Sequence, residues 1–172
     1  MLTDAHTTRP RGRLIELFLA TALTLLAAAG LCGALAHDYQ LGPLKIEHPW
    51  TRATPGCAMA AGGFMKITNT GSAPDRLVSG TLVSAGAVEI HETRMEGNVM
   101  RMRRLERGLA IAPGQTVELR PGSLHVMFMQ LKTGFKEGER LSGTLVFEKA
   151  GTIAVDFKVE AMGAKADGAH QH

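Results

Sequence analysis

The sequence predicts a single all-β domain, folded as a β-sandwich or barrel and preceded by a signal peptide for export. The chain has 172 residues, of which 45% are apolar and 20% charged, and this is the usual size and balance of one globular domain. After residue 37, short runs of alternating apolar and polar residues are separated by turn residues, and no run has a convincing helical period. These observations argue against a two-domain enzyme, a disordered chain and a multi-span membrane protein.

Residues 1–36 have the three parts of a secretory signal peptide. Arg9, Arg11 and Arg13 precede an uncharged apolar run at residues 17–29, and Ala34-Leu35-Ala36 forms an A-x-A cleavage site. We therefore expect a periplasmic or otherwise extracytoplasmic protein whose mature chain starts at His37. The alternative is an uncleaved N-terminal membrane anchor, because residues 17–36 carry no charge over about the length that spans a bilayer.

The mature chain is predicted to contain at least eight antiparallel strands. Each combines alternating or β-branched apolar residues with flanking turn residues, as at Pro113-Gly114 and Pro121-Gly122. The last two strands are joined by a short hairpin connection at residues 148–151. The predicted strands cover residues 63–69, 77–83, 87–93, 99–103, 115–120, 124–131, 141–147 and 153–161.

The predicted β domain covers residues 37–162, and the tail at residues 163–172 is expected to be mobile because it has no large apolar side chain. After cleavage at residue 36, Cys57 is the single remaining cysteine, so no internal disulfide can form. Aromatic residues make up 5% of the chain, so the pI of 9.1 is weak support for nucleic-acid binding, and no nucleic-acid partner is expected.

Histidine and methionine side chains gather on the polar faces of the predicted strands. In the strand at 124–131, period-two alternation places His125, Met127 and Met129 on one face, opposite Val126 and Phe128.

The same alternation separates His91 from the apolar Val88 and Ile90 in the strand at 87–93. Met100 and Met102 share one face of the next strand. Two histidines, His91 and His125, and several methionines are thus predicted to lie on strand faces away from the core.

Thioether sulfur combined with imidazole is a ligand set that suits Cu(I), whereas zinc and iron usually recruit thiolate or carboxylate. The alternative is structural, because methionine often fills irregular gaps in a core and a strand histidine is often simply hydrogen-bonded. A blue-copper electron-transfer site is disfavoured, since it needs a cysteine beside two histidines and Cys57 is distant along the chain. We interpret Cys57 as a small buried or loop thiol.

Four segments of the sequence resemble the PCu(A)C family of periplasmic copper chaperones. The resemblance is carried by HPWTRATPG, by AAGGFMKITNTGSAPDRLV, by the long run from VEIHETRMEGNVMRMRRLERG to LHVMFMQLK and by LVFEKAGTIAVDFKV, at residues 48–56, 60–78, 88–132 and 145–159. It implies a cupredoxin-like Greek-key sandwich or barrel. The family motif, a His, ten residues, a Met and then a His-x-Met, implies Cu(I) ligation by His91, Met102, His125 and Met127.

The resemblance also implies a function, in which the protein would bind copper and deliver it to the CuA centre in subunit II of cytochrome c oxidase. A second copper chaperone is a further candidate partner, and contact with the membrane would come only through the partner. Secondary copper ligands are expected among the remaining soft or imidazole side chains, with Cu(II) at the C-terminal tail; the candidates are Met100, Met129, Met162, His170 and His172.

No enzyme is predicted, because the sequence shows no nucleophile with a base, no paired carboxylates and no thiol pair. Two other functions remain open from the residues alone. One is a periplasmic copper buffer or resistance protein that sequesters copper without delivering it, and the other is a carbohydrate- or protein-binding sandwich without metal.

Overall fold

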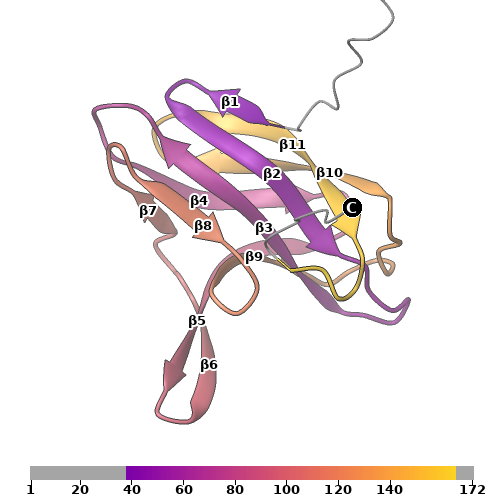
Figure 1. The fold of residues 1–172 in the computed structure, drawn as a ribbon. Helices are drawn as coiled ribbons and strands as arrows, with labels where there is room; N and C mark the ends of the chain where they lie inside the picture. Colours follow the sequence, from indigo (N-terminus) through magenta and orange to yellow (C-terminus); the bar gives the residue numbers. More distant parts are fainter. Residues whose placement is uncertain (1–37, 166–172) are drawn as a thin grey trace, which may run out of the picture. The chain divides into compact units, whose positions relative to one another are not determined.

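All regular structure in residues 38–165, the residues that the computed structural model describes, is β-strand. Figure 1 shows these strands wrapping around a common interior, so the all-β prediction is confirmed. No helix within residues 38–165 is long and apolar enough to cross a membrane. The eleven strands are β1 (Tyr39–Leu41), β2 (Leu44–Arg52), β3 (Ala60–Asn69), β4 (Asp75–Leu82), β5 (Ala87–Glu96), β6 (Val99–Arg104), β7 (Leu109–Ile111), β8 (Thr116–Leu119), β9 (Leu124–Met129), β10 (Arg140–Phe147) and β11 (Gly151–Glu160).

The strands form one continuous sheet in the order β6-β5-β9-β3-β2-β11-β10-β4-β7, with β1 added to β2 and β8 added to β3. Every pair is antiparallel except β11 with β2, which run parallel through Lys158 to Glu160. Strand β5 lies between β6 and β9, so the two segments with the predicted histidines are hydrogen-bonded neighbours.

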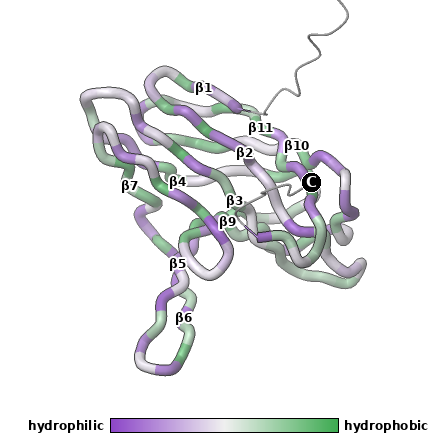
Figure 2. The backbone as a smooth tube through the Cα atoms, viewed as in Figure 1, coloured by the Kyte–Doolittle hydropathy of each residue, from purple (hydrophilic) through white to green (hydrophobic). Residues whose placement is uncertain are grey.

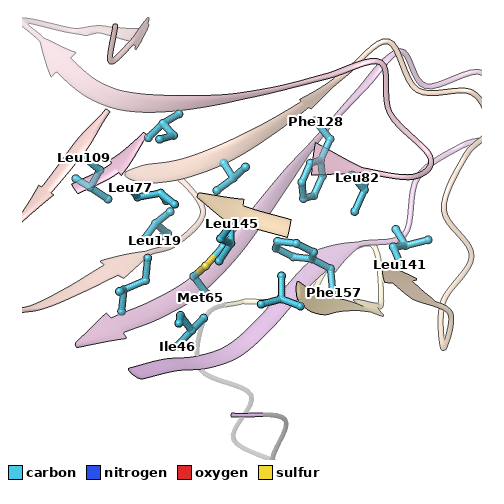
Figure 3. Close-up of a cluster of buried hydrophobic side chains, with 14 of the residues drawn as sticks. Ile46, Met65, Leu77, Leu82, Leu109, Leu119, Phe128, Leu141, Leu145 and Phe157 are labelled. Carbon is cyan, nitrogen blue, oxygen red and sulfur yellow. The ribbon is translucent and has the colours of Figure 1, made fainter. Parts of the chain in front are cut away.

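The core lies between the apolar faces of the curled sheet. Strands β10 and β11 show how the sequence builds it, because alternate residues such as Leu145 and Phe157 are buried while their neighbours face outward. Figure 2 shows the matching alternation of hydropathy along the strands, and Figure 3 shows side chains from several strands meeting in this interior. Phe128 of β9 packs edge to face on Phe157, with ring centres 5.0 Å apart.

The eight predicted strands all exist, with boundaries that differ by up to three residues. The predicted strand at 87–93 continues to Glu96, and the one at 124–131 ends at Met129 because Gln130 adopts a positive φ of 54°. The structure adds β1, β2 and β7, which the sequence did not predict. The leader and residues 166–172 lie outside the described residues.

The sequence does not predict strand β2, because its alternation of apolar and polar residues is interrupted. The pairing of β2 with β3 shifts between Glu47 and Trp50, and His48 has a positive φ of 48° at this bulge. Proline at position 49 also argues against a central strand when only the sequence is considered.

Candidate metal centre

The β5–β6 hairpin places the first predicted pair of ligands on one face. Its two-residue loop begins at Gly97, whose positive φ of 62° suits the first central position of a type II′ turn. From this turn, the antiparallel register sets Met102 opposite Thr93 and Arg104 opposite His91. Met102 is therefore the diagonal neighbour of His91 on the same face of the hairpin, at a typical separation of about 7–8 Å.

Strand β9 completes the arrangement from the other side of β5. His125 lies directly opposite His91, and Met127 lies directly opposite Glu89. The two imidazole rings have their centres 5.8 Å apart and are tilted by 47°. Since a metal–imidazole bond is about 2 Å long, as it is for zinc, this separation leaves room for one ion between the rings. His91, Met102, His125 and Met127 thus share one face of three neighbouring strands.

A carboxylate holds one ring nitrogen of His91. The Nε2 atom of His91 lies 2.8 Å from a carboxylate oxygen of Glu89, and the other oxygen of Glu89 accepts a hydrogen bond from Arg104 at 3.0 Å. Hydrogen bonding to His91, together with the nearby Arg104 charge, lowers the pKa of Glu89 despite the opposing effect of desolvation. Because an ionised carboxylate can only accept, Nε2 of His91 must donate.

The other ring nitrogen of His91 has no partner. Its Nδ1 atom is the single buried side-chain nitrogen or oxygen without a hydrogen bond in residues 38–165. In a neutral ring whose Nε2 carries the proton, Nδ1 carries the lone pair. An unpaired buried acceptor is costly unless it binds something, so this atom fits a metal ligand.

In His125 the hydrogen-bonded ring nitrogen is Nδ1, whereas in His91 it is Nε2. It is 5% exposed, and its Nδ1 atom donates to the backbone carbonyl of Ser123 at 2.9 Å. Burial lowers the pKa of His125, with a smaller contribution from neighbouring His91, and together these outweigh the carbonyl hydrogen bond. His125 is therefore neutral at pH 7, with its lone pair on Nε2.

Glycine at position 62 makes room for an aromatic ring beside the partner of Met127. Gly62 of β3 lies directly opposite Met127 and has no side chain of its own. A Cβ atom at Gly62 would lie 2.8 Å from the ring of Phe64. The adjacent Gly63 faces the core, where a Cβ atom would lie 2.6 Å from Phe128. The pair of glycines thus fits β3 between the core and the candidate site.

The secondary ligands predicted from the sequence that lie within residues 38–165 do not form one cluster. Met129 shares the His125 face by alternation, and Met100 lies exposed near the hairpin turn. Met162 follows β11, which is separated from β9 by β2 and β3 in the sheet, so the structure does not bring it to this site. His170 and His172 lie outside the described residues. Cys57 is free and exposed in the loop before β3, which agrees with its interpretation as a loop thiol.

No group of three or more His, Cys, Asp or Glu side chains suited to a metal ion occurs within residues 38–165. The candidate centre instead combines two imidazoles with thioethers, the donor set expected for Cu(I). Sequence reasoning missed Glu89 and Arg104 as supports of His91. The spacing of Glu89, two residues before His91 on the same face, was a visible signal, whereas Arg104 is found only from the hairpin register.

Residues 44–159 match the model of the family described as LpqE-like. The chain belongs to this family. A relative of this LpqE-like chain, named "Putative lipoprotein Lxx21020", occurs in Leifsonia xyli subsp. xyli. The two are 30% identical over 139 residues, which cover 76% of this chain and 82% of the relative.

Solved PCuAC domains have the same fold as the LpqE-like chain. The copper-bound PCuAC domain from PmoF2 is 31% identical, with a TM-score of 0.62 over 73% of this chain and 98% of that domain. The solution structure of CuI-DR1885 from Deinococcus radiodurans is 25% identical, with a TM-score of 0.58 over 80% of this chain and 88% of that protein. The predicted cupredoxin-like β-sandwich is therefore confirmed, and the chain is PCuAC-like.

Proposed function

We propose that this protein is an extracytoplasmic copper chaperone that binds Cu(I) through His91, Met102, His125 and Met127. The observation that carries the proposal is the pair of directly opposed imidazoles with ring centres 5.8 Å apart, one of which has a buried, unpartnered nitrogen. The copper-bound PmoF2 domain and CuI-DR1885 support copper as the cargo.

The donor set suits a carrier. All four proposed ligands are neutral when they bind a metal, since a histidine coordinates through the lone pair of an uncharged ring and thioethers carry no charge. Thioethers bind Cu(I) through soft sulfur but are weaker ligands than thiolates. A partner that offers cysteine thiolates can therefore displace them one at a time, while Cu(I) keeps its charge and no electron moves.

The position of Met102 gives a partner access to the metal. His125 is buried, but Met102 is 53% exposed on the hairpin that Figure 1 shows projecting from the body of the sheet. The acceptor that we propose is the CuA centre in subunit II of cytochrome c oxidase, whose cysteines would attack from the Met102 side. A second copper chaperone is a further proposed partner at this acceptor.

The proposed location is the periplasm or another extracytoplasmic compartment, reached through the leader at residues 1–36. A relative named as a lipoprotein supports export and also favours an N-terminal anchor as the alternative. The mass of the exported protein distinguishes a chain that starts at His37 from one that keeps its leader.

Replacement of both proposed imidazole ligands tests the copper site. We expect His91→Ala combined with His125→Ala to abolish tight Cu(I) binding in anaerobic competition against a chromophoric chelator, while the circular dichroism of the fold is retained. The matched control is His48→Asn, which removes an exposed imidazole paired with Glu160 and keeps a residue that tolerates positive φ. An unchanged Cu(I) affinity in the double variant would reject the site.

Copper delivery separates a chaperone from a copper buffer. The Cu(I)-loaded protein is mixed anaerobically with a purified apo CuA domain, and copper is measured in each protein after separation. A chaperone transfers its copper to the CuA domain. A buffer that only sequesters the metal keeps it, and that result would replace the chaperone proposal with the buffer.

A further inference from the structure

The β5–β6 hairpin extends beyond the strand that flanks it. Pairing of β5 with β9 ends at Glu92, opposite Leu124, but pairing of β5 with β6 continues to Glu96, opposite Val99. The outer part of the hairpin is thus a two-stranded ribbon, which Figure 1 shows extending away from the rest of the sheet.

The two faces of this ribbon have different chemistry. On one face, ion pairs join the charged side chains of the two strands: Glu92 contacts Arg103 at 2.9 Å, and Glu96 contacts Arg101 at 2.9 Å. The other face continues the candidate copper site and carries methionines. They are Met95, Met100 and Met102, which are 61%, 64% and 53% exposed.

Packing does not explain these three methionines. Methionine commonly fills irregular gaps inside cores, but these side chains lie mostly in solvent. Exposed strand positions are better filled by threonine or other β-branched residues. Neighbouring exposed apolar side chains usually mark a binding surface.

The register brings the three thioethers within reach of one ion. Met95 and Met100 are direct cross-strand partners, so their Cβ atoms lie about 4.5–5.5 Å apart. Met102 is the diagonal neighbour of Met95 on the same face. Each side chain has three rotatable bonds, so all three sulfur atoms can turn toward a common point.

We propose that Met95, Met100 and Met102 form a second, weaker Cu(I) site that loads the His91–His125 site. Binding by three neutral thioethers follows from the hairpin alone, whereas the loading role rests on the proposed chaperone function. The ligands of this second site are all soft thioether sulfur atoms, so the site selects Cu(I) over Cu(II) and Zn²⁺.

Met102 is shared by the two sites, and this gives the transfer a simple path. The Cu–S bonds to Met95 and Met100 break, Cu–N bonds to His91 and His125 form, and the bond to Met102 is kept. The ion stays Cu(I) throughout, and each imidazole binds it through the ring nitrogen that is not hydrogen-bonded to Glu89 or to the carbonyl of Ser123.

The test uses the full mature chain with 13C-labelled methionine methyl groups and Ag(I) as a redox-inert substitute for Cu(I). We expect the first equivalent to shift the methyl signals of Met102 and Met127. The second equivalent should shift those of Met95 and Met100, which bind it through two sulfur atoms because Met102 is held by the first ion. In Met95→Leu with Met100→Leu, the second event is lost and the first is retained. The matched control is Met59→Leu with Met162→Leu, which removes two other exposed thioethers and keeps both events.

Failures of the two proposals are distinguishable. If Met95 and Met100 do not respond to a second equivalent, or if the Met95→Leu, Met100→Leu variant keeps an identical second event, the thioether site is refuted. If Met102 and Met127 do not respond to the first equivalent, the chaperone site fails instead. Loading is followed separately as the rate of Cu(I) uptake from a chelator complex: a several-fold slower first event in the leucine variant supports the loading role, and an unchanged rate refutes it.

Discussion

The two histidines of the candidate centre are fixed by different atoms. His91 gives its Nε2 hydrogen to Glu89, and His125 gives its Nδ1 hydrogen to the carbonyl of Ser123. The nitrogen left for a metal is therefore Nδ1 in one ring and Nε2 in the other. Directly opposed residues can in this way bind one ion although their rings have unlike orientations.

The role of Glu89 in positioning His91 leads to a mutational prediction. Glu89→Ala should weaken Cu(I) binding by about 10- to 100-fold, since loss of a hydrogen-bonding partner behind a ligand typically has this effect. Glu89→Gln should partly restore the affinity, because its amide oxygen still accepts from Nε2 of His91. Affinity is measured by anaerobic competition, and long-range 1H–15N spectra report which nitrogen of His91 carries the proton.

The control for this prediction is on the same strand. Glu92→Ala removes a carboxylate that pairs with Arg94 and Arg103 on the opposite face of β5. Equal losses of affinity in Glu89→Ala and Glu92→Ala would contradict a specific role for Glu89.

At the residue scale, alternation was sufficient to predict which side chains share a face. It placed His125 and Met127 together and separated both from the core. It could not show that His91 faces His125, because that contact depends on how β5 aligns with β9, and many residues separate these strands in the chain. The resemblance to copper chaperones supplied the set of ligands that alternation could not.

At the scale of elements, Asp75 at the start of β4 fixes the turn between β10 and β11. One carboxylate oxygen accepts from the backbone N–H groups of Arg76 and Lys149, and the other accepts from Ala150. Burial by itself would raise the pKa of Asp75, but these three hydrogen bonds outweigh it and lower the pKa below the usual value.

The sign of the pH effect follows from this lowered pKa. Because the folded protein binds the proton less tightly than the unfolded chain, the stabilisation by Asp75 is fully present above its unfolded pKa of about 4. It is lost as the pH falls through the lower pKa of the folded state. Asp75→Asn should reduce the free energy of unfolding by about 1–3 kcal/mol at pH 7 and weaken the decline in stability toward acid pH.

Urea unfolding at several pH values measures this effect. The control is Glu148→Gln in the same turn, whose carboxylate is exposed and paired with Arg76, and which should change stability by less than about 1 kcal/mol. If Asp75→Asn and Glu148→Gln showed the same small loss at pH 7, the turn would not depend on Asp75.

Elements with uninterrupted patterns were the ones that the sequence could predict. The connection at residues 148–151 was recognised because alternating strands flank it on both sides. Strands β1 and β7 have three residues each, too few to show a period, and β2 is broken by the bulge at His48. A strand whose pairing changes register cannot be identified from period two alone.

At the scale of the whole molecule, the fold class follows from composition and alternation, but the strand order does not. In the sheet, β9 pairs with β5 on one side and with β3 on the other, and β11 pairs in parallel with β2. None of these pairings joins strands that are consecutive in the sequence. Such long-range pairings are decided by the burial of the whole core, which includes Phe128, Phe135 and Phe157. One of them, the pairing of β5 with β9, is what brings the two histidines of the candidate centre together.

The arrangement separates stability from copper chemistry. The apolar faces of the strands form a core that does not contain the proposed ligands, and the proposed ligands occupy the other face of β5, β6 and β9. Exchange of ligands on the outer face would therefore leave the packing of the core unchanged, which suits the proposed release of copper from a folded protein.

X-ray absorption of the anaerobic protein loaded with one equivalent of Cu(I) is the decisive experiment for the proposed coordination, because it identifies the atoms bound to the metal. We expect two nitrogen and two sulfur neighbours in the native protein, and loss of the nitrogen neighbours when His91 and His125 are replaced by alanine. A copper ion surrounded only by oxygen or nitrogen, or a spectrum unaffected by the two replacements, would show that copper binds elsewhere.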